Sequence, residues 1–146
     1  MLATIRRMRL EDIEAVEELF QEYVKINTSR REAILESRSD EYSDISAAEV
    51  GGKVVGIVHQ VFYADPLHRG PPWNILFLYV SKSFRSQGIG ELVLKETLNN
   101  VAERQVPEVH VSTRAGNVAA IELYMKLGFR HSGPLFEYSP RELIHT

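Results

Sequence analysis

The chain has 146 residues, a formal net charge of −3, 44% hydrophobic and 25% charged residues, and no cysteine. These values are typical of one globular domain with its own core, and they exclude a disulfide framework, a cysteine-zinc site and a thiol nucleophile. The sequence has no basic run and no apolar run of about 20 residues, so we expect neither nucleic-acid binding nor a membrane span. The N-terminus lacks the apolar core of a signal peptide, and we therefore expect a cytoplasmic protein.

The N-terminal part predicts one strand followed by two helices. Thr4–Arg9 alternates modestly and is expected to form a short strand. From Ile13 to Val24, apolar residues recur at three- and four-residue spacing, as on the buried face of a helix. Asp12 is expected to cap that helix, because an aspartate accepts hydrogen bonds from the first N–H groups. A second, weaker helix should turn Ile34 and Leu35 inward.

Two adjacent glycines predict a tight hairpin. The stretches Ile45–Val50 and Val54–Phe62 are rich in β-forming residues, and Gly51 and Gly52 join them. Both glycines can take the positive φ that a two-residue hairpin turn requires. Gly56 lies inside the second strand, where a glycine indicates a β-bulge or a close backbone contact.

The stretch Tyr63–Trp73 is predicted to be a loop, because it contains three prolines and a glycine. Loops often carry binding residues, although most loop side chains only cover the surface. The side chains that could line a substrate cleft are Asp65, His68, Arg69 and Trp73.

The C-terminal half predicts alternating strands and helices. The expected elements, in chain order, are a buried strand at Ile75–Val80, a helix at Gly88–Gln105, a strand at Val109–Ser112, a helix at Val118–Leu127 after the cap Asn117, and closing strands at Phe129–His131 and Glu142–His145. With the N-terminal elements, the order is β-α-α-β-β-β-α-β-α-β-β. This order predicts a single mixed α/β domain over residues 1–146.

The joint between the buried strand and its helix has the sequence Arg85-Ser-Gln-Gly-Ile-Gly90. The first N–H groups of a helix have no intrahelical partner and carry partial positive charge. Gly88 and Gly90 lack a Cβ, so an anion can approach the backbone closely. The joint therefore predicts a seat for a phosphate or pyrophosphate group.

Three known motifs were compared with this joint. A phosphate-binding NTPase loop needs Lys-Ser or Lys-Thr after its last glycine, and none follows Gly90. A dinucleotide fingerprint needs a third glycine, but Val93 occupies that position. The pattern [Q/R]-x-x-G-x-[G/A] does fit, with Arg85 as its first residue. A helix start without a ligand is the alternative if the joint is taken alone.

A second motif follows one strand later, in Asn117-Val-Ala-Ala-Ile-Glu-Leu-Tyr-Met-Lys-Leu-Gly-Phe129. It fits N-x-x-A-x-x-x-Y-x-x-x-G-F at Asn117, Ala120, Tyr124, Gly128 and Phe129. In this order and spacing, the two motifs resemble those of the GCN5-related N-acetyltransferase (GNAT) family. The resemblance is sharp from about Leu78 to His131 and looser in the N-terminal half.

The resemblance implies a mixed, mostly antiparallel central sheet with a splayed parallel strand pair, helices on both faces, and acetyl-CoA as cosubstrate. The pantetheine arm would pair with the open strand edge at Leu78, Tyr79 and Val80. The pyrophosphate would bind the N–H groups of Ser86, Gln87, Gly88, Ile89, Gly90 and Glu91. Arg85 would contact the phosphates or remain a surface arginine. Asn117 would hold the pantetheine amide besides capping its helix, or act as a cap alone.

The chemistry implied by the resemblance is direct transfer of an acetyl group from the thioester to a primary amine, without a metal. Tyr124 matches the family's position for the acid that protonates the departing thiolate, and a buried structural tyrosine is the alternative. A backbone N–H of the central strand, at Val80, would meet the developing oxyanion.

The general base departs from the family's known subgroups. Histone-type members have a glutamate where this chain has Asn74, and members that act on ribosomal-protein N-termini have one where it has Ser112. Neither replacement can act as a carboxylate base. The possible substitutes, besides water, are Glu49, His59, His68 and His110.

Two other classes of function compete with an enzyme. The missing carboxylates favour a non-catalytic CoA-binding or sensing module, whereas the retained Tyr124 favours the enzyme. A protein-interaction domain without a cofactor does not account for the phosphate-binding joint. The acceptor amine could belong to a polyamine, an aminoglycoside-like compound, an amino acid or a protein, and the chain could form a homodimer.

Overall fold

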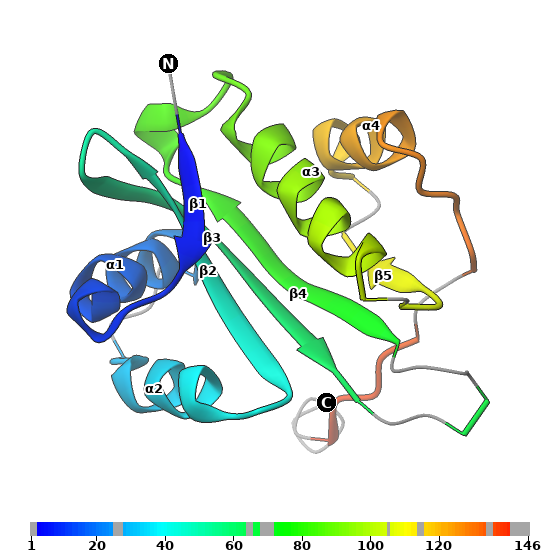
Figure 1. The fold of residues 1–146 in the computed structure, drawn as a ribbon, viewed down its shortest axis with the longest axis horizontal. Helices are drawn as coiled ribbons and strands as arrows, with labels where there is room; N and C mark the ends of the chain where they lie inside the picture. The colour runs from blue at the N-terminus through cyan, green and yellow to red at the C-terminus, as the bar shows by residue number, and fades with distance from the viewer. Residues whose placement is uncertain are drawn as a thin grey trace. The chain divides into compact units, whose positions relative to one another are not determined.

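A computed structural model describes residues 3–24, 28–63, 66–67, 72–104, 106–113, 116–133 and 136–140 (Figure 1). Its helices and strands are β1 (Thr4–Arg7), the 3-10 turn η1 (Leu10–Asp12), α1 (Ile13–Val24), α2 (Arg31–Ser39), β2 (Ser43–Val50), β3 (Lys53–Phe62), β4 (Trp73–Val80), the 3-10 turn η2 (Lys82–Phe84), α3 (Ile89–Ala102), β5 (Val109–Val111) and α4 (Val118–Lys126). The chain divides into two units, residues 1–111 and 112–146. The first unit holds every described strand, and the second holds α4.

The first unit is built on a five-stranded sheet with the order β1-β2-β3-β4-β5. Three neighbouring pairs are antiparallel, and β4 and β5 are parallel. A parallel pair needs a long crossover, and α3 supplies it between β4 and β5. The predicted mixed, mostly antiparallel sheet with one parallel pair is therefore confirmed.

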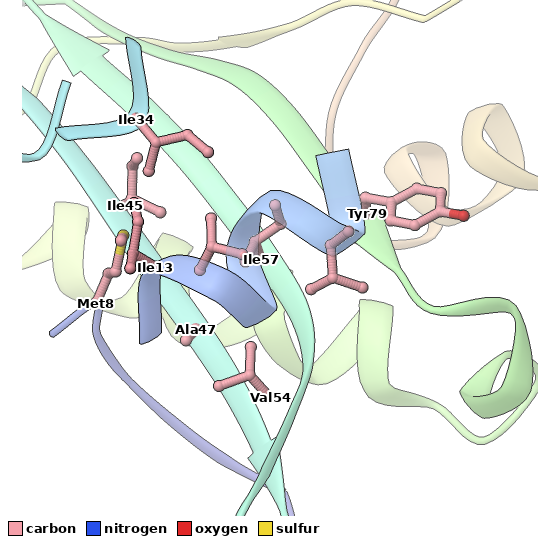
Figure 2. Packing of buried hydrophobic residues seen from close by; sticks show 10 residues of the cluster. Met8, Ile13, Ile34, Ile45, Ala47, Val54, Ile57 and Tyr79 are labelled. Carbon is pink, nitrogen blue, oxygen red and sulfur yellow. The ribbon is translucent and has the colours of Figure 1, made fainter. Parts of the chain in front are cut away.

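α1 and α2 bury one face of the sheet. Their shared core is a cluster of buried apolar side chains from α1, α2, the strands β2, β3 and β4, and the residue after β1, comprising Met8, Ile13, Val16, Leu19, Ile34, Ile45, Ala47, Val54, Ile57 and Tyr79 (Figure 2). The predicted inward position of Ile34 is confirmed, and Leu35 packs half-buried against the cluster. Tyr79 lies at one end of the cluster, and its hydroxyl group points away from the other labelled side chains (Figure 2).

The chain enters α1 through a buried ion pair. Asp12 was expected to cap α1, but it lies in η1, and its carboxylate accepts a 2.7 Å hydrogen bond from the N–H of Arg9. The same carboxylate receives two hydrogen bonds from the guanidinium of Arg6, at 2.6 and 2.9 Å. Arg6 and the Arg9 N–H lower the pKa of Asp12, because they stabilise its charged form. Asp12 therefore holds the turn that precedes α1, through Arg6 and the Arg9 N–H, and does not cap α1 itself.

β1 is the outermost described strand next to β2, and it is shorter than expected. It pairs with β2 over four residues, and both of its arginines form ion pairs with acids of β2. Arg6 contacts Glu49 at 3.4 Å, and Arg7 contacts Asp44 at 3.3 Å. This strand thus presents charge along its length.

The predicted hairpin between β2 and β3 is confirmed. Gly51 and Gly52 have φ angles of 57° and 82°, which a side chain would disfavour. Gly56 lies opposite the register shift between Ala48 and Glu49, and a Cβ on it would come within 3.2 Å of the Tyr79 carbonyl oxygen. Both expectations for this glycine, a bulge and a close backbone contact, hold.

α3 packs against the face of β4 opposite to α1. Successive side chains of a strand point to opposite faces, so Val80 points away from the α1 side where Tyr79 lies. A Cβ built on Gly90 of α3 would lie 3.8 Å from a methyl group of Val80. The buried residues of α3 are Ile89, Val93, Leu94, Thr97 and Val101. Leu92 and Leu98 are half-buried, and Ala102 is exposed.

In the second unit, the predicted helix is confirmed and one predicted strand is wrong. α4 ends at Lys126, and Gly128 follows with a φ of 98°. Phe129–His131 forms no strand, because a strand exists only where a second strand pairs with it. Instead, the Phe129 N–H turns back to the carbonyl of Tyr124 at 3.0 Å. The other predicted closing strand, Glu142–His145, lies outside the described residues.

Candidate functional site

β4 has two halves with different neighbours. β3 pairs with it from Trp73 to Val80, but β5 pairs only with Trp73, Asn74 and Ile75. We call Trp73–Ile75 the paired half and Leu76–Val80 the open half. Among the described strands, the open half has a neighbour on one side alone.

The direction of the backbone groups shows which residues face the open edge. The Ser81 N–H donates to the Val55 carbonyl of β3 at 2.8 Å, so the backbone of Ser81 points toward β3. Backbone groups alternate sides along a strand, so those of Tyr79 also point toward β3 and those of Leu78 and Val80 point to the open edge. The edge predicted at Leu78, Tyr79 and Val80 therefore offers the backbone groups of Leu78 and Val80.

The loop between β4 and α3 begins with a held arginine and continues through an unusual backbone. Arg85 Nε donates to the Val80 carbonyl at 3.2 Å, and its guanidinium carbon lies 5.1 Å from the ring centre of Tyr79. Ser86 has a φ of 62°, a left-handed conformation that non-glycine residues seldom adopt. Such conformations persist where the surrounding structure enforces them, and they gather at ligand-binding loops. Residues 85–88 are all exposed.

The start of α3 presents backbone N–H groups toward this loop. The Leu92 N–H bonds to the Gly88 carbonyl at 3.0 Å, so Ile89, Gly90 and Glu91 precede the first α-helical hydrogen bond. The side chain of Ile89 is buried and anchors the turn. Gly88 has a φ of 80°, and a Cβ built on it would meet nothing within 4 Å. The glycine is thus required by its backbone angle, and the space beside it is open to a ligand.

Glu22 contacts the same loop from the last turn of α1. Its carboxylate accepts hydrogen bonds from the Tyr79 hydroxyl and the Lys82 N–H, both at 2.8 Å. These partners lie 57 and 60 residues further along the chain, so no local pattern could indicate the contact. The Lys82 N–H is the main cause that lowers the pKa of Glu22.

His59 is half-buried on the α1 face of the sheet, opposite Phe77 in the open half of β4. Its Nε2 lies 2.8 Å from the hydroxyl oxygen of Ser43, which is itself buried. Burial lowers the pKa of His59, and the nearby charge of Asp44 opposes this shift. His59 is therefore a neutral imidazole at physiological pH, and a neutral imidazole can accept a proton.

The other candidate bases have different surroundings. Glu49 forms its ion pair with Arg6 at the β1 edge. His110 is exposed and lies 2.8 Å from the carboxylate of Glu108 on β5. His68 lies outside the described residues. Of the three described candidates, only His59 is paired with the open half of β4.

The predicted substrate loop is described only in part. Asp65, His68 and Arg69 lie outside the described residues. Trp73 was expected in the loop, but it begins β4 and is buried, with its ring stacked on Phe62 at 4.7 Å and its indole N–H donating to Gln60. Burial of the large Trp73 ring against Phe62 of β3 stabilises this residue in a strand. The loop prediction rested on the nearby prolines and could not include this contact.

The second unit carries the remaining motif residues. Asn117 caps α4, since its side-chain oxygen accepts a 3.2 Å hydrogen bond from the Ala120 N–H. Tyr124 is half-buried, and its ring centre lies 5.7 Å from that of Phe129. The predicted cap is confirmed, while the proposed contacts of both residues with a cofactor stay predictions.

Two absences apply to the described residues alone. Within them, no group of three His, Asp or Glu side chains is placed to hold a metal ion. No helix in the described part of the chain has the length and apolar character needed to cross a membrane.

The fold is shared with known N-acetyltransferases. AAC(6')-Iy, an aminoglycoside N-acetyltransferase solved with the bisubstrate analogue CoA-S-monomethyl-acetylneamine, superposes with a TM-score of 0.82 at 17% identity, covering 97% of this chain and 99% of that one. At this identity the likeness establishes the fold.

The sequence establishes the family. The model of the acetyltransferase (GNAT) family matches residues 8–129, and the chain belongs to this family. N-acetyltransferase family 8 member 3 from Rattus norvegicus is 32% identical over 67% of this chain and 43% of its own length. N-alpha-acetyltransferase 30 from Dictyostelium discoideum is 39% identical over 62% of this chain and 48% of its own length. The chain thus spans about half the length of these curated relatives.

Proposed function

We propose that the protein is an N-acetyltransferase that moves the acetyl group of acetyl-CoA to a primary amine. The observation that carries this proposal is the open half of β4, which leads directly into the exposed glycine loop at the start of α3. A strand edge with unpaired backbone groups suits an extended pantetheine arm, and a helix start suits a pyrophosphate. Membership of the acetyltransferase family supports the same assignment.

The cofactor contacts follow from this placement. The pantetheine arm pairs with the backbone groups of Leu78 and with the Val80 carbonyl, which also accepts from Arg85, and the pyrophosphate binds the N–H groups from Ser86 to Glu91. The exposed guanidinium of Arg85 adds positive charge beside the phosphates. Asn117 contributes its amide to the pantetheine in addition to capping α4. AAC(6')-Iy, which shares the fold, was solved with a CoA-containing analogue, and this supports CoA as the ligand.

In the reaction, the amine nitrogen forms a bond to the thioester carbonyl carbon, and the carbonyl oxygen becomes an oxyanion. An N–H group at the open edge, that of Val80, stabilises the oxyanion. The carbon–sulfur bond then breaks, and the thiolate takes a proton from the phenol of Tyr124. The proton that leaves the amine nitrogen goes to a base.

His59 is the base that the geometry favours. It lies one strand away from the open edge, and its lowered pKa keeps it able to accept a proton at neutral pH. The free amine of a lysine has a pKa of about 10.4, so the acceptor must lose a proton before it attacks. The carboxylates used by other subgroups are absent here, because Asn74 and Ser112 occupy their positions.

The acceptor is a primary amine of a small molecule or of a protein. The names of similar proteins cover both kinds, since AAC(6')-Iy is an aminoglycoside enzyme and the Dictyostelium relative is an N-alpha-acetyltransferase. We further propose that residues 1–146 act as one catalytic domain, because the family match runs from residue 8 to residue 129 across both units.

The test is the release of free CoA thiol from acetyl-CoA across a panel of polyamines, aminoglycosides, lysine peptides and peptide N-termini. The chain has no cysteine, so every thiol detected comes from the cosubstrate. Acceptor-dependent release is expected, and Tyr124→Phe should lower kcat by about 100-fold. Thermal protection by CoA without release on any acceptor would instead favour a binding module. No protection at all would overturn the cofactor assignment.

A further inference from the structure

Glu22 connects the α1 side of the sheet to the loop that follows β4. The side chain of Glu22 is half-buried in the last turn of α1. One carboxylate oxygen, Oε1, accepts from both the Tyr79 hydroxyl and the Lys82 N–H. The other oxygen, Oε2, lies 3.4 Å from the Ser81 hydroxyl. A single side chain thus contacts three residues at the end of β4 and the start of η2.

The contact with Lys82 replaces a missing local cap. η2 begins after Ser81, whose side chain makes no capping hydrogen bond. The first N–H groups of a helical turn need an acceptor, and a carboxylate there is favoured by the partial positive charge. Glu22 supplies that acceptor from 60 residues earlier in the chain. The start of the loop is therefore fixed by α1.

The contact with Tyr79 extends this hold to Arg85. The Tyr79 hydroxyl donates to Glu22, which fixes the orientation of the phenol ring. The Arg85 guanidinium lies over that ring at 5.1 Å, and Arg85 Nε donates to the Val80 carbonyl. Burial, together with the hydrogen bond to Glu22, raises the pKa of Tyr79, so the phenol stays protonated and keeps donating. The Arg85 guanidinium thus packs on the Tyr79 ring, whose orientation is fixed by the hydrogen bond to Glu22.

The charge of Glu22 has the wrong sign for a phosphate-binding role of its own. A carboxylate close to the pyrophosphate loop repels an anionic ligand. The hydrogen bonds of Glu22 position the loop and Arg85, and for Glu22 to favour ligand binding this positioning must stabilise the complex by more than the repulsion destabilises it. The two effects predict opposite outcomes when the charge alone is removed.

We infer that Glu22 is a positioning residue for CoA, which fixes the start of the pyrophosphate loop and, through Tyr79, the guanidinium of Arg85. This inference rests on the proposed function, because it assumes that the loop holds the cosubstrate. It assigns a role to α1 that neither family motif contains. Glu22 touches no reacting atom, so its effect is on cosubstrate affinity.

The experiment measures the CoA dissociation constant by calorimetry, and KM and kcat for acetyl-CoA, in Glu22→Gln and Tyr79→Phe. Glu22→Gln removes the charge and keeps an acceptor oxygen, and Tyr79→Phe removes the hydroxyl and keeps the ring beneath Arg85. Hydrogen bonds to charged groups are the stronger kind, so we expect about tenfold weaker CoA binding in Glu22→Gln and about threefold in Tyr79→Phe. KM should rise in parallel while kcat stays within about twofold.

Glu18→Gln is the matched control, because Glu18 is exposed on the same helix and the substitution removes the same charge. It should leave CoA binding unchanged. The double variant Glu22→Gln/Tyr79→Phe should weaken CoA binding by less than the product of the two single effects, since both act through one hydrogen bond. Tighter CoA binding in Glu22→Gln, or a fall in kcat at constant KM, would overturn the inference. If Glu22→Gln does not fold, Tyr79→Phe alone decides it. Wild-type protein that fails to bind CoA refutes the proposed function itself.

Discussion

The two halves of β4 differ in what satisfies their backbone. The paired half, Trp73–Ile75, has β3 on one side and β5 on the other, and two of its three side chains, Trp73 and Ile75, are buried. The open half, Leu76–Val80, has β3 as its one neighbour among the described strands. The start of the strand thus serves stability, and under the proposed function its end binds the cosubstrate. The predictions below separate these two roles.

The largest effect is expected from Trp73→Ala in the paired half. Removing a buried tryptophan leaves a cavity beside Phe62 and should lower the free energy of unfolding by about 3–5 kcal/mol. Urea denaturation measures the loss. Leu76→Ala, on the same strand but 58% exposed, is the control and should change stability by no more than about 0.5 kcal/mol. Equal losses in both variants would remove the distinction between the halves.

His59→Gln tests the chemistry assigned next to the open half. Loss of a general base should lower kcat by about 100-fold and leave KM for acetyl-CoA near its original value. The wild-type rate should fall on the acid side with a midpoint below the ordinary histidine pKa, because burial lowers the pKa of His59. Protonation of His59 removes the base, so the rate falls on the acid side of the pH profile. The His59→Gln variant should not show this fall.

The free energy of unfolding of the wild type should also fall as the pH decreases. A histidine whose folded pKa is lowered contributes stability above its unfolded pKa and loses it as the pH falls through the folded value.

His110→Gln is the control for His59→Gln, because His110 is exposed and paired with Glu108 on β5. A pH profile unchanged in His59→Gln would exclude His59 as the base.

Gly56→Ala should disturb the open half without touching its edge. The added Cβ would lie 3.2 Å from the Tyr79 carbonyl oxygen, a backbone atom that can move only if β3 and β4 separate. We expect a loss of about 1–2 kcal/mol in unfolding free energy, together with weaker CoA binding. Gly116→Ala, where a Cβ meets nothing within 4 Å, is the control for both measurements. Weaker stability with unchanged CoA affinity would show that the edge tolerates the shift.

The smallest effect is expected at the start of α3. Gly90→Ala should raise stability by about 0.5–1 kcal/mol, because alanine favours the helix and its Cβ makes only an ordinary contact with Val80. CoA binding should persist, since the motif accepts alanine at this position. Gly88→Ala should instead cost about 1 kcal/mol, because Gly88 has a φ of 80°. Thermal unfolding with and without CoA distinguishes the two.

The sequence predicted those features whose cause lies within a few residues. The hairpin at Gly51 and Gly52, the cap Asn117 and the glycine loop before α3 each depend on a local backbone angle or side-chain acceptor. The order of strands and helices followed from apolar spacing. Two motifs in the right order then indicated the family before any tertiary contact was known.

The features that it missed depend on contacts between distant segments. Glu22 reads as a solvated acid of α1 until β4 brings Tyr79 and Lys82 against it. Phe129–His131 was predicted as a strand, but none of the described strands pairs with it. Such outcomes are decided by tertiary structure, which local propensity does not encode.

The charged strand β1 has a consequence for how copies of this chain can associate. An outermost strand with unpaired backbone groups is a template for pairing with another molecule, and short length and charge counteract this. β1 has four residues, and its Arg6 and Arg7 form ion pairs with acids of β2. A strand added beside β1 would have to pack next to these charged side chains, which are already paired with β2. A homodimer should therefore use another surface, and concentrated solutions of the protein should resist strand-to-strand aggregation at this edge.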